Sequence, residues 1–289
     1  DYSQSGTGTR SQVGVQHETP THVASETVAI TNHSQSTCNH LDISIRLTVS
    51  EHESATTNEQ AHRVREMFAT IAARYDLLNH VLSGNIDKRW RRLVARTLGD
   101  TLANSEARIL DVACGTGDLS LTLFAGSKAQ ITGLDFCRPM LTIAAAKAAK
   151  SESNVPFIEG DALVLPFRDC SFEATTIAFG LRNLTSVEAG FNELRRVLKP
   201  GGRVAVLEFS KPKALVLRSI FRIYFTKLLP LFGGLISGSK SAYEYLPDSV
   251  SRFPDQEQLV AIMKAAGFVE VSYQNLTGGI AALHLGTRP

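Results

Sequence analysis

The residues best suited to chemistry lie between positions 108 and 135, where acids and glycines follow short apolar runs. Asp111 stands inside the first run, and Gly115, Thr116 and Gly117 form a turn directly after it. Glycines let a backbone pass close to a ligand, because no Cβ occupies that space. A strand, a tight turn and the start of a helix are therefore expected here, with a ligand above the turn.

A second apolar run, residues 130–134, ends in Asp135. In doubly wound folds, an acid at the end of the second strand accepts hydrogen bonds from both hydroxyls of a ribose. We therefore expect Asp135 to bind the sugar of a nucleoside cofactor beside the glycine turn.

The turn is compatible with two kinds of nucleoside cofactor, a dinucleotide and a sulfonium. A dinucleotide-binding turn has the pattern G-x-G-x-x-G, in which helix amides bind a pyrophosphate. Here Ser120 occupies the third glycine position, and Asp118 adds a negative charge that repels a pyrophosphate but not a sulfonium. The pattern D-x-x-x-G-x-G at Asp111, Gly115 and Gly117 resembles the first motif of class I S-adenosylmethionine-dependent methyltransferases.

Alternating strands and helices must position these residues. Strands are expected at 109–113, 130–134, 155–159, 174–179 and 203–209, followed by an antiparallel pair at 268–275 and 280–285. This rhythm predicts the α/β class, with a Rossmann-like, doubly wound and mostly parallel sheet. Ligands of such sheets bind beyond the carboxyl ends of the strands. The groups expected at that edge include Asp161, Ala162, Arg182, Asn183 and Glu208.

Composition limits the function classes. The chain of 289 residues has a net charge of +2, so nucleic acid is not an expected partner. The four cysteines lack C-x-x-C pairing and the eight histidines lack metal-ligand spacing, so we expect a reducing compartment and no metal site. No apolar run reaches the roughly 18 residues of a membrane span.

The chain divides by composition. Residues 1–58 are rich in Ser, Thr, Gln and His, and we expect them to be disordered. Residues 59–289 are the expected folded domain, with a helical cap at 59–106 and an insertion at 211–254. Arg218 and Arg222 share one helix face in that insertion. Such a helix either rests on an anionic membrane or covers a sheet edge with its arginine stems.

Several stretches together resemble the ubiquinone/menaquinone biosynthesis C-methyltransferase family. They are Tyr75–Trp90, Asp111–Asp118, Phe179–Asn183, Arg196–Pro212, Tyr243–Gln256 and Asn275–Gly286. The resemblance covers nearly everything beyond the N-terminal tail. Two positions depart from the family pattern: Asp87 replaces the usual His, and Ala178 replaces a common Ser.

The resemblance implies methylation of a ring carbon of a polyprenylated hydroquinone by S-adenosylmethionine. The reaction would convert demethylmenaquinol to menaquinol or act on a polyprenyl-benzoquinol in ubiquinone synthesis. Thr116, Asp135, Asp161 and Ala162 would then contact the cofactor, and Asp161 suits the adenine amino group.

Catalytic roles are assigned as hypotheses. A cation beside a quinolate oxygen lowers the barrier to attack by the ring carbon. We assign that cation to Arg182, which stays protonated and so does not act as the base. Asn183, Tyr243 and His284 are candidates for binding the ring oxygens, and Tyr75 for closing over the cofactor.

The expected partners are the polyprenylated substrate and, transiently, a membrane surface, which makes the protein a cytoplasmic, peripherally membrane-associated enzyme. A homodimer is compatible with the sequence. Two alternatives stay open: a methyltransferase for another small phenol or lipid, and a non-catalytic nucleoside-binding module. The ring type is also open, although residues 75–83 lean toward menaquinone-type members.

Overall fold

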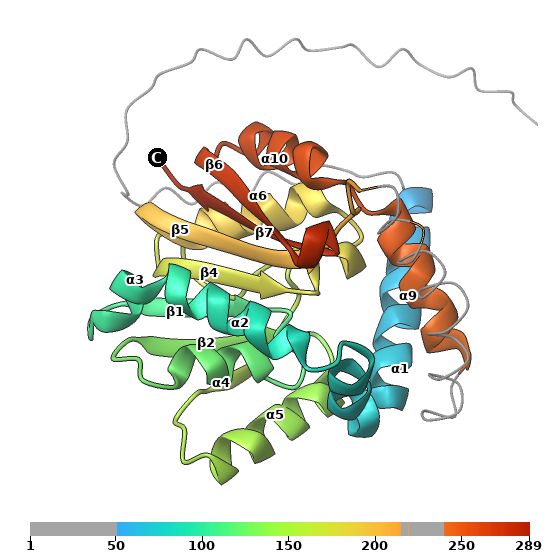
Figure 1. Cartoon of the computed structure of the whole chain (residues 1–289), viewed down its shortest axis with the longest axis horizontal. Helices are drawn as coiled ribbons and strands as arrows, with labels where there is room; N and C mark the ends of the chain where they lie inside the picture. The colour runs from blue at the N-terminus through green and yellow to red at the C-terminus, as the bar shows by residue number, and fades with distance from the viewer. Residues whose placement is uncertain (1–50, 215–218, 220–239) are drawn as a thin grey trace, which may run out of the picture. The chain divides into compact units, whose positions relative to one another are not determined.

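Seven strands form one sheet, in the order β3-β2-β1-β4-β5-β7-β6, in the computed structural model (Figure 1). The structure describes residues 51–214, 219 and 240–289. Pairs among β1 to β5 are parallel, whereas β7 runs antiparallel to both β5 and β6. The expected fold class is therefore confirmed. The strands are β1 (Arg108–Val112), β2 (Gln130–Asp135), β3 (Phe157–Glu159), β4 (Phe172–Ala178), β5 (Leu198–Phe209), β6 (Val269–Leu276) and β7 (Ala281–Thr287).

The register of the parallel strands brings their carboxyl ends to one edge of the sheet. Val112, the last residue of β1, pairs with Leu134 on one side and Ile177 on the other. Asp135 lies opposite Glu159. The chain segments that leave these strands therefore meet above a common edge, as the sequence predicts.

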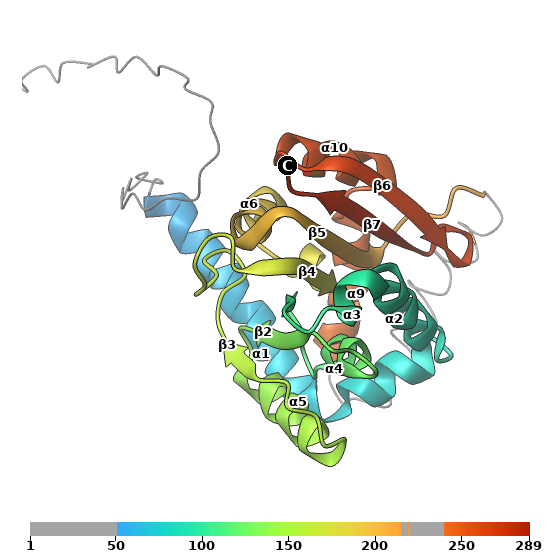
Figure 2. The ribbon, with the colours of Figure 1, turned by 90° about the vertical axis from the view of Figure 1, so that its left-hand side faces the viewer.

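Helices cover both faces of the sheet (Figures 1 and 2). On one face, α6 (Val187–Val197) and α10 (Gln256–Ala265) pack apolar side chains against Leu110 and Val206. On the other face, α2 (Ile86–Thr97) and α4 (Asp118–Phe124) pack against Ile109 and Ala205. Because neighbouring strand residues point to opposite faces, a central strand such as β1 or β5 contributes to both cores. A short helix, α3 (Gly99–Ala103), follows α2, and α5 (Arg138–Lys150) lies beside β3.

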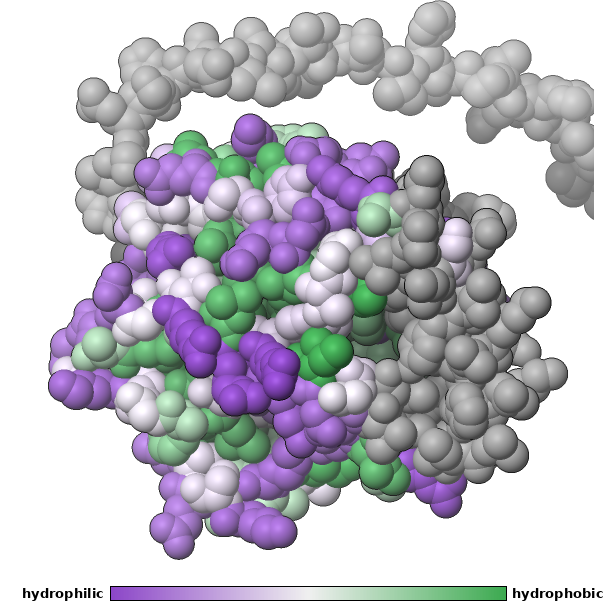
Figure 3. Space-filling model, viewed as in Figure 1, coloured by the Kyte–Doolittle hydropathy of each residue, from purple (hydrophilic) through white to green (hydrophobic). Residues whose placement is uncertain are grey.

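The amphipathic sequence of α2 explains its orientation. Trp90 and Val94 are buried, whereas Lys88, Arg89 and Arg92 are exposed. Figure 3 shows strongly hydrophilic residues gathered over this helix. The apolar stripe therefore fixes which side of α2 faces the sheet, and the basic side faces water.

A long helix, α1 (Glu51–Leu82), packs against α5, α2 and α9 (Lys240–Arg252). It begins at Glu51, within the stretch 1–58 that we expected to be disordered. Gly84 and Asn85, at φ 58° and 63°, separate α1 from α2. In the described part of the chain, no helix is long and apolar enough to cross a membrane.

Of the insertion expected at 211–254, the structure describes residues 211–214, which follow β5, residue 219, and the stretch from Lys240, where α9 begins. The basic face that we expected at Arg218 and Arg222 lies outside the described residues.

Candidate active site

The glycine turn between β1 and α4 uses its two glycines differently. Gly117 caps α4 at φ 80°, and a Cβ added there would lie 2.9 Å from the ring of Phe157. A Cβ on Gly115, at φ 56°, would meet no atom within 4 Å. Gly117 is therefore required by the packing beneath the turn, whereas Gly115 leaves open space above it.

Asp135 ends β2 directly beside this turn. Its Oδ2 accepts a hydrogen bond from the Gly115 amide and its Oδ1 from the Cys137 amide, both at 2.8 Å. Burial raises the pKa of Asp135, and these backbone donors oppose the rise. A carboxylate offers about four acceptor positions, so the side chain keeps room for two further hydroxyl donors.

The strand-end cavity, of about 470 Å³, collects six of the residues predicted from the sequence. They are Tyr75, Gly115, Asp135, Asp161, Ala162 and Asn183. The volume lies within the roughly 300–1,000 Å³ typical of small-molecule sites. Helix α1 supplies the facing wall.

Thr116 and Gly117, also predicted to bind the cofactor, do not line this cavity. The Thr116 hydroxyl is buried and donates a hydrogen bond to Asp76 of α1. Lys147 of α5 pairs with Asp76 at 2.8 Å and also with Asp118. Lys147 therefore compensates the charge of Asp118, so this acid does not repel a pyrophosphate as strongly as we expected from the sequence.

A second, inner cavity of about 90 Å³ adjoins the strand-end cavity and shares Phe68 and Tyr75 with it. Its volume is well below that of common ligand sites, so a ring can enter only if lining side chains move. Its apolar lining is Met67, Phe68, Ile71, Tyr75, Trp90, Phe179, Phe209 and Leu246, and its polar lining is Asn79, Ser83, Asp87, Arg91, Arg182 and Tyr245.

Arg182 reaches the inner cavity from η1, a short 3-10 helix (Leu181–Asn183) after β4. Its Nη1 lies 2.8 Å from Oε1 of Glu208, and the two side chains are 6% and 1% exposed. The guanidinium lies over the ring of Phe209, 5.3 Å from its centroid. Its Nε is buried and has no hydrogen-bond partner within the described residues. Arg182 is thus a buried, oriented cation with one donor to spare.

Tyr75 stands between the two cavities. It packs edge-on against Phe68 at a centroid distance of 5.9 Å, and its hydroxyl hydrogen-bonds Asn79. Burial raises its pKa, against the opposing charge of Arg182, so the phenol stays neutral at physiological pH. Tyr75 and Phe68 together form the wall that the two cavities share.

Other expected ring-binding residues are placed differently. Oδ1 of Asn183 accepts a hydrogen bond of 3.1 Å from the hydroxyl of Tyr245, a residue that the sequence analysis missed. Tyr243 belongs to α9, but its side chain lies outside the described residues. His284 is buried in β7, stacks on Tyr273 and lines neither cavity.

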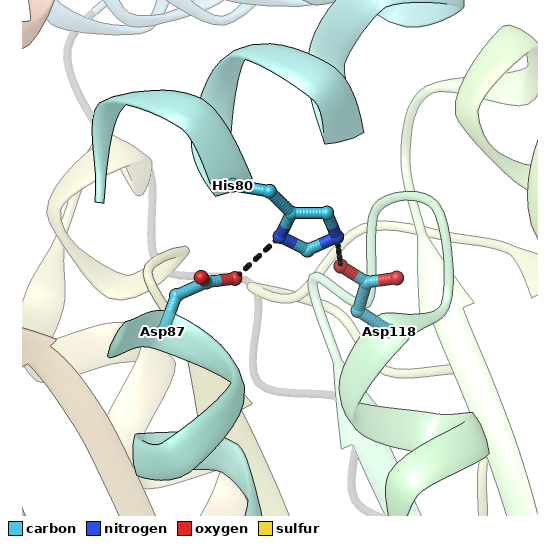
Figure 4. A group of neighbouring side chains, drawn as sticks. All are labelled: His80, Asp87 and Asp118. Carbon is cyan, nitrogen blue, oxygen red and sulfur yellow. Dashed lines mark hydrogen bonds and ion pairs between the residues drawn. The ribbon is translucent and has the colours of Figure 1, made fainter. Parts of the chain in front are cut away.

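Three side chains that can bind a metal lie together, although their spacing in the sequence does not predict a metal site: His80, Asp87 and Asp118 (Figure 4). Nδ1 of His80 lies 2.8 Å from Asp87, and Nε2 lies 3.6 Å from Asp118. The two acids thus approach different nitrogens of the ring. Arg91 pairs with Asp87 and lies 3.6 Å from Asp118, so a fixed cation already compensates both acids. The cluster is an ion-pair network.

The features of this edge define the class. A glycine turn after β1, an acid at the end of β2 that reaches this turn, and an adjoining cavity on a doubly wound sheet characterise a nucleoside-binding site. The model of the ubiE/COQ5 methyltransferase family matches residues 55–288, so the chain belongs to that family. Membership confirms the expected S-adenosylmethionine cofactor and the expected methyltransferase activity.

Curated relatives match along nearly their whole length. Demethylmenaquinone methyltransferase of Thermus thermophilus is 51% identical over 224 residues, which are 77% of this chain and 100% of that protein. The Deinococcus radiodurans protein of the same name is 46% identical, over 80% of this chain and 94% of its own. The ubiquinone/menaquinone biosynthesis C-methyltransferase UbiE of Pseudomonas aeruginosa is 41% identical, over 82% and 93%.

Solved structures support the fold alone. A SAM-dependent methyltransferase from Thermotoga maritima aligns with a TM-score of 0.55 at 19% identity, over 78% of this chain and 99% of that one. The [4+2]-cyclase SpnF aligns with a TM-score of 0.53 at 21% identity, over 68% and 80%. Because a cyclase shares the architecture, the architecture does not identify the substrate.

Proposed function

We propose that this enzyme methylates a ring carbon of a polyprenylated hydroquinone, and that a demethylnaphthoquinol is its preferred ring. The observation that carries the proposal is the pair of adjoining cavities divided by Tyr75. One is lined by acids suited to a nucleoside, and the other combines an apolar lining with two buried cations, Arg91 and Arg182. The two relatives named demethylmenaquinone methyltransferase, at 51% and 46% identity, favour the naphthoquinol.

The strand-end cavity suits the cofactor. Asp135 accepts from the ribose hydroxyls, Asp161 from the adenine amino group, and Gly115 permits close approach of the ligand to the turn. Bound there, S-adenosylmethionine supplies an electrophilic methyl group on a sulfonium. The protein's part is to hold the ring carbon in line with that methyl group and to keep water out.

The inner cavity suits the ring. As the ring carbon attacks, negative charge develops on a quinol oxygen, and a fixed cation in an apolar site stabilises that charge. Arg182 is held for this role by Glu208 and Phe209, and its spare Nε donor is available to the oxygen. We propose that Tyr245, which lines this cavity, binds a second oxygen, and that Asn183, which lines the strand-end cavity, orients the Tyr245 hydroxyl through their hydrogen bond.

The isoprenoid tail gives the insertion a role. We propose that residues 211–240 meet an anionic membrane surface transiently, because apolar residues there alternate with Arg218, Arg222 and Lys227. Replacing Arg218 and Arg222 by Glu should weaken binding to vesicles that contain anionic lipid. Unchanged binding would remove the basis for this contact.

The test of the proposed activity is methyl transfer from labelled S-adenosylmethionine to short-tailed demethylnaphthoquinol and, separately, to the corresponding benzoquinol. We expect methylated naphthoquinol to form faster. Faster benzoquinol methylation would reverse the ring assignment. If neither ring is methylated although the protein binds the cofactor, the quinol proposal is wrong.

A further inference from the structure

A third cavity, the turn cavity, lies at the glycine turn and measures only about 30 Å³. It shares Tyr75, Ala113 and Gly115 with the strand-end cavity. A ligand that fills the strand-end cavity and extends past the glycine turn would therefore place its end group here. This volume is well below that of common ligand sites, so the end group enters only if lining side chains move, as at the inner cavity.

Arg91 is the one basic residue that lines the turn cavity within the described residues, and its side chain is 9% exposed. Its position is fixed from two sides. Nη1 pairs with Asp87, and the guanidinium lies 5.8 Å from the centroid of Phe179. Both ion pairs of Arg91 within the described residues go through Nη1, whereas a guanidinium has five N–H donors. Donors therefore remain for a further anion.

Asp87 and Asp118 hold the Arg91 guanidinium through their ion pairs with its Nη1. In Figure 4 they lie on opposite sides of the His80 ring, which spaces the two carboxylates. Lys147 takes the other oxygen of Asp118. Because these contacts determine where the guanidinium sits before any ligand arrives, little side-chain entropy is lost when it binds an anion.

Charges of both signs meet in the turn cavity. Arg91 lines it together with the carboxylates of Asp111 and Asp118. A cation facing acids across a small space complements a group that carries its own negative and positive charges. The methionyl tail of S-adenosylmethionine is such a group, with an α-carboxylate and an α-ammonium.

We infer that Arg91 binds the α-carboxylate of the cofactor's methionyl tail, with Asp111 facing the α-ammonium, because Asp118 is already paired with Lys147 and Arg91. This inference rests on the proposed function, because it takes the cofactor's nucleoside to lie in the strand-end cavity. Arg91 thereby sets the depth of the cofactor and the position of its methyl group beside Tyr75.

The test compares two nucleosides by calorimetry. S-adenosylhomocysteine carries the amino-acid tail, and 5′-methylthioadenosine lacks it. Because charge-assisted hydrogen bonds to a buried carboxylate are strong, Arg91→Gln should lower the affinity for S-adenosylhomocysteine about 10- to 100-fold. The affinity for 5′-methylthioadenosine should stay within about twofold. Arg91→Lys, which keeps the charge but not the planar fork, should fall between wild type and Arg91→Gln.

Two controls address folding. Arg91→Gln leaves the Asp87 carboxylate without its cation, so the double variant Asp87→Asn/Arg91→Gln, which removes both charges, should show the same selective loss. Arg92→Gln alters the exposed neighbour on the same helix and should change neither affinity.

The outcomes separate the two proposals. The carboxylate assignment is overturned if the Arg91 variants lose affinity for both nucleosides equally. It is also overturned if the wild type binds both with equal affinity. If the wild type binds neither nucleoside, the proposed function itself fails.

Discussion

Removing the cation of the buried Arg182–Glu208 pair should cost both stability and turnover, and the structure separates the two effects. We consider Arg182→Met, which replaces the apolar stem of the side chain by an apolar stem and removes the charged guanidinium. Glu208 is then a buried carboxylate without its ion-pair partner. Because both side chains are nearly inaccessible to water, water does not replace the lost partner.

The magnitude follows from the geometry. Two unit charges 2.8 Å apart attract by about 6 kcal/mol at an effective dielectric constant of about 20, and their desolvation offsets much of this. Loss of one partner of a buried pair costs about 3–5 kcal/mol. The amides of Arg182 and Phe209 also donate to Glu208, so they continue to stabilise its charge. We therefore expect a loss of about 3 kcal/mol in the free energy of unfolding.

Urea unfolding of three proteins tests this value: wild type, Arg182→Met, and Arg182→Met/Glu208→Gln. The double variant buries no unpaired charge, so it should recover most of the stability. Its turnover should nevertheless stay low, because the cation that faces the quinol oxygen is gone. Its affinity for S-adenosylhomocysteine, measured by calorimetry, should match that of the wild type.

Two results would refute this reasoning. If the single and double variants lose equal stability, the charge of Glu208 does not depend on Arg182. If the double variant turns over at the wild-type rate, Arg182 has no electrostatic role in methyl transfer.

Three further predictions concern the turn and its acids. Both glycines have a positive φ, so an alanine at either position is strained, but only the methyl group at position 117 also meets Phe157. Gly117→Ala should therefore lower stability by about 1–3 kcal/mol in thermal or urea unfolding, and by more than Gly115→Ala. Gly115→Ala should chiefly weaken cofactor binding, and the opposite pattern would contradict the roles given to the two glycines. Asp135→Ala should lower the affinity for S-adenosylhomocysteine at least about 100-fold in calorimetry, because the substitution removes both the ribose acceptor and the hydrogen bond that anchors the Gly115 amide. Unchanged affinity would exclude the ribose contact. Burial raises the pKa of Asp111 from 3.8 to about 6. The protonated Asp111 side chain therefore contributes its full stability to the fold below about pH 4, and this contribution is lost as the pH rises through 6. Asp111→Asn should therefore gain about 3 kcal/mol relative to wild type between pH 4 and pH 7, and a difference that does not vary with pH in urea unfolding would show that Asp111 does not titrate in this range.

The parts of the fold that the sequence predicted well depend on local pattern. The apolar run before Gly115, the run ending in Asp135 and the antiparallel pair at the C-terminus each carry their signal within about ten residues. Parallel sheet topology then brings the strand ends to one edge, so Asp135, Asp161 and Asn183 could be assigned to one cavity before any coordinates.

The parts that could not be predicted depend on contacts between distant segments. Lys147 compensates Asp118 from another helix, and nothing near Asp118 in the sequence reveals it. The inner cavity draws its lining from α1, α2, α9 and the ends of two strands, so no single stretch contains its pattern. Tyr245 lies two residues from the expected Tyr243, and the aromatic run alone could not show which ring reaches Asn183.

Helix α1 contributes Phe68 and Tyr75 to the walls of both cavities. The cofactor and the quinol therefore contact the same two side chains from opposite sides. The ligand that binds first fixes the positions of Phe68 and Tyr75, and the second ligand must fit the shape that results. Thermodynamic linkage requires this influence to be mutual, so any gain in quinol affinity caused by the bound nucleoside must appear as an equal gain in nucleoside affinity caused by the quinol.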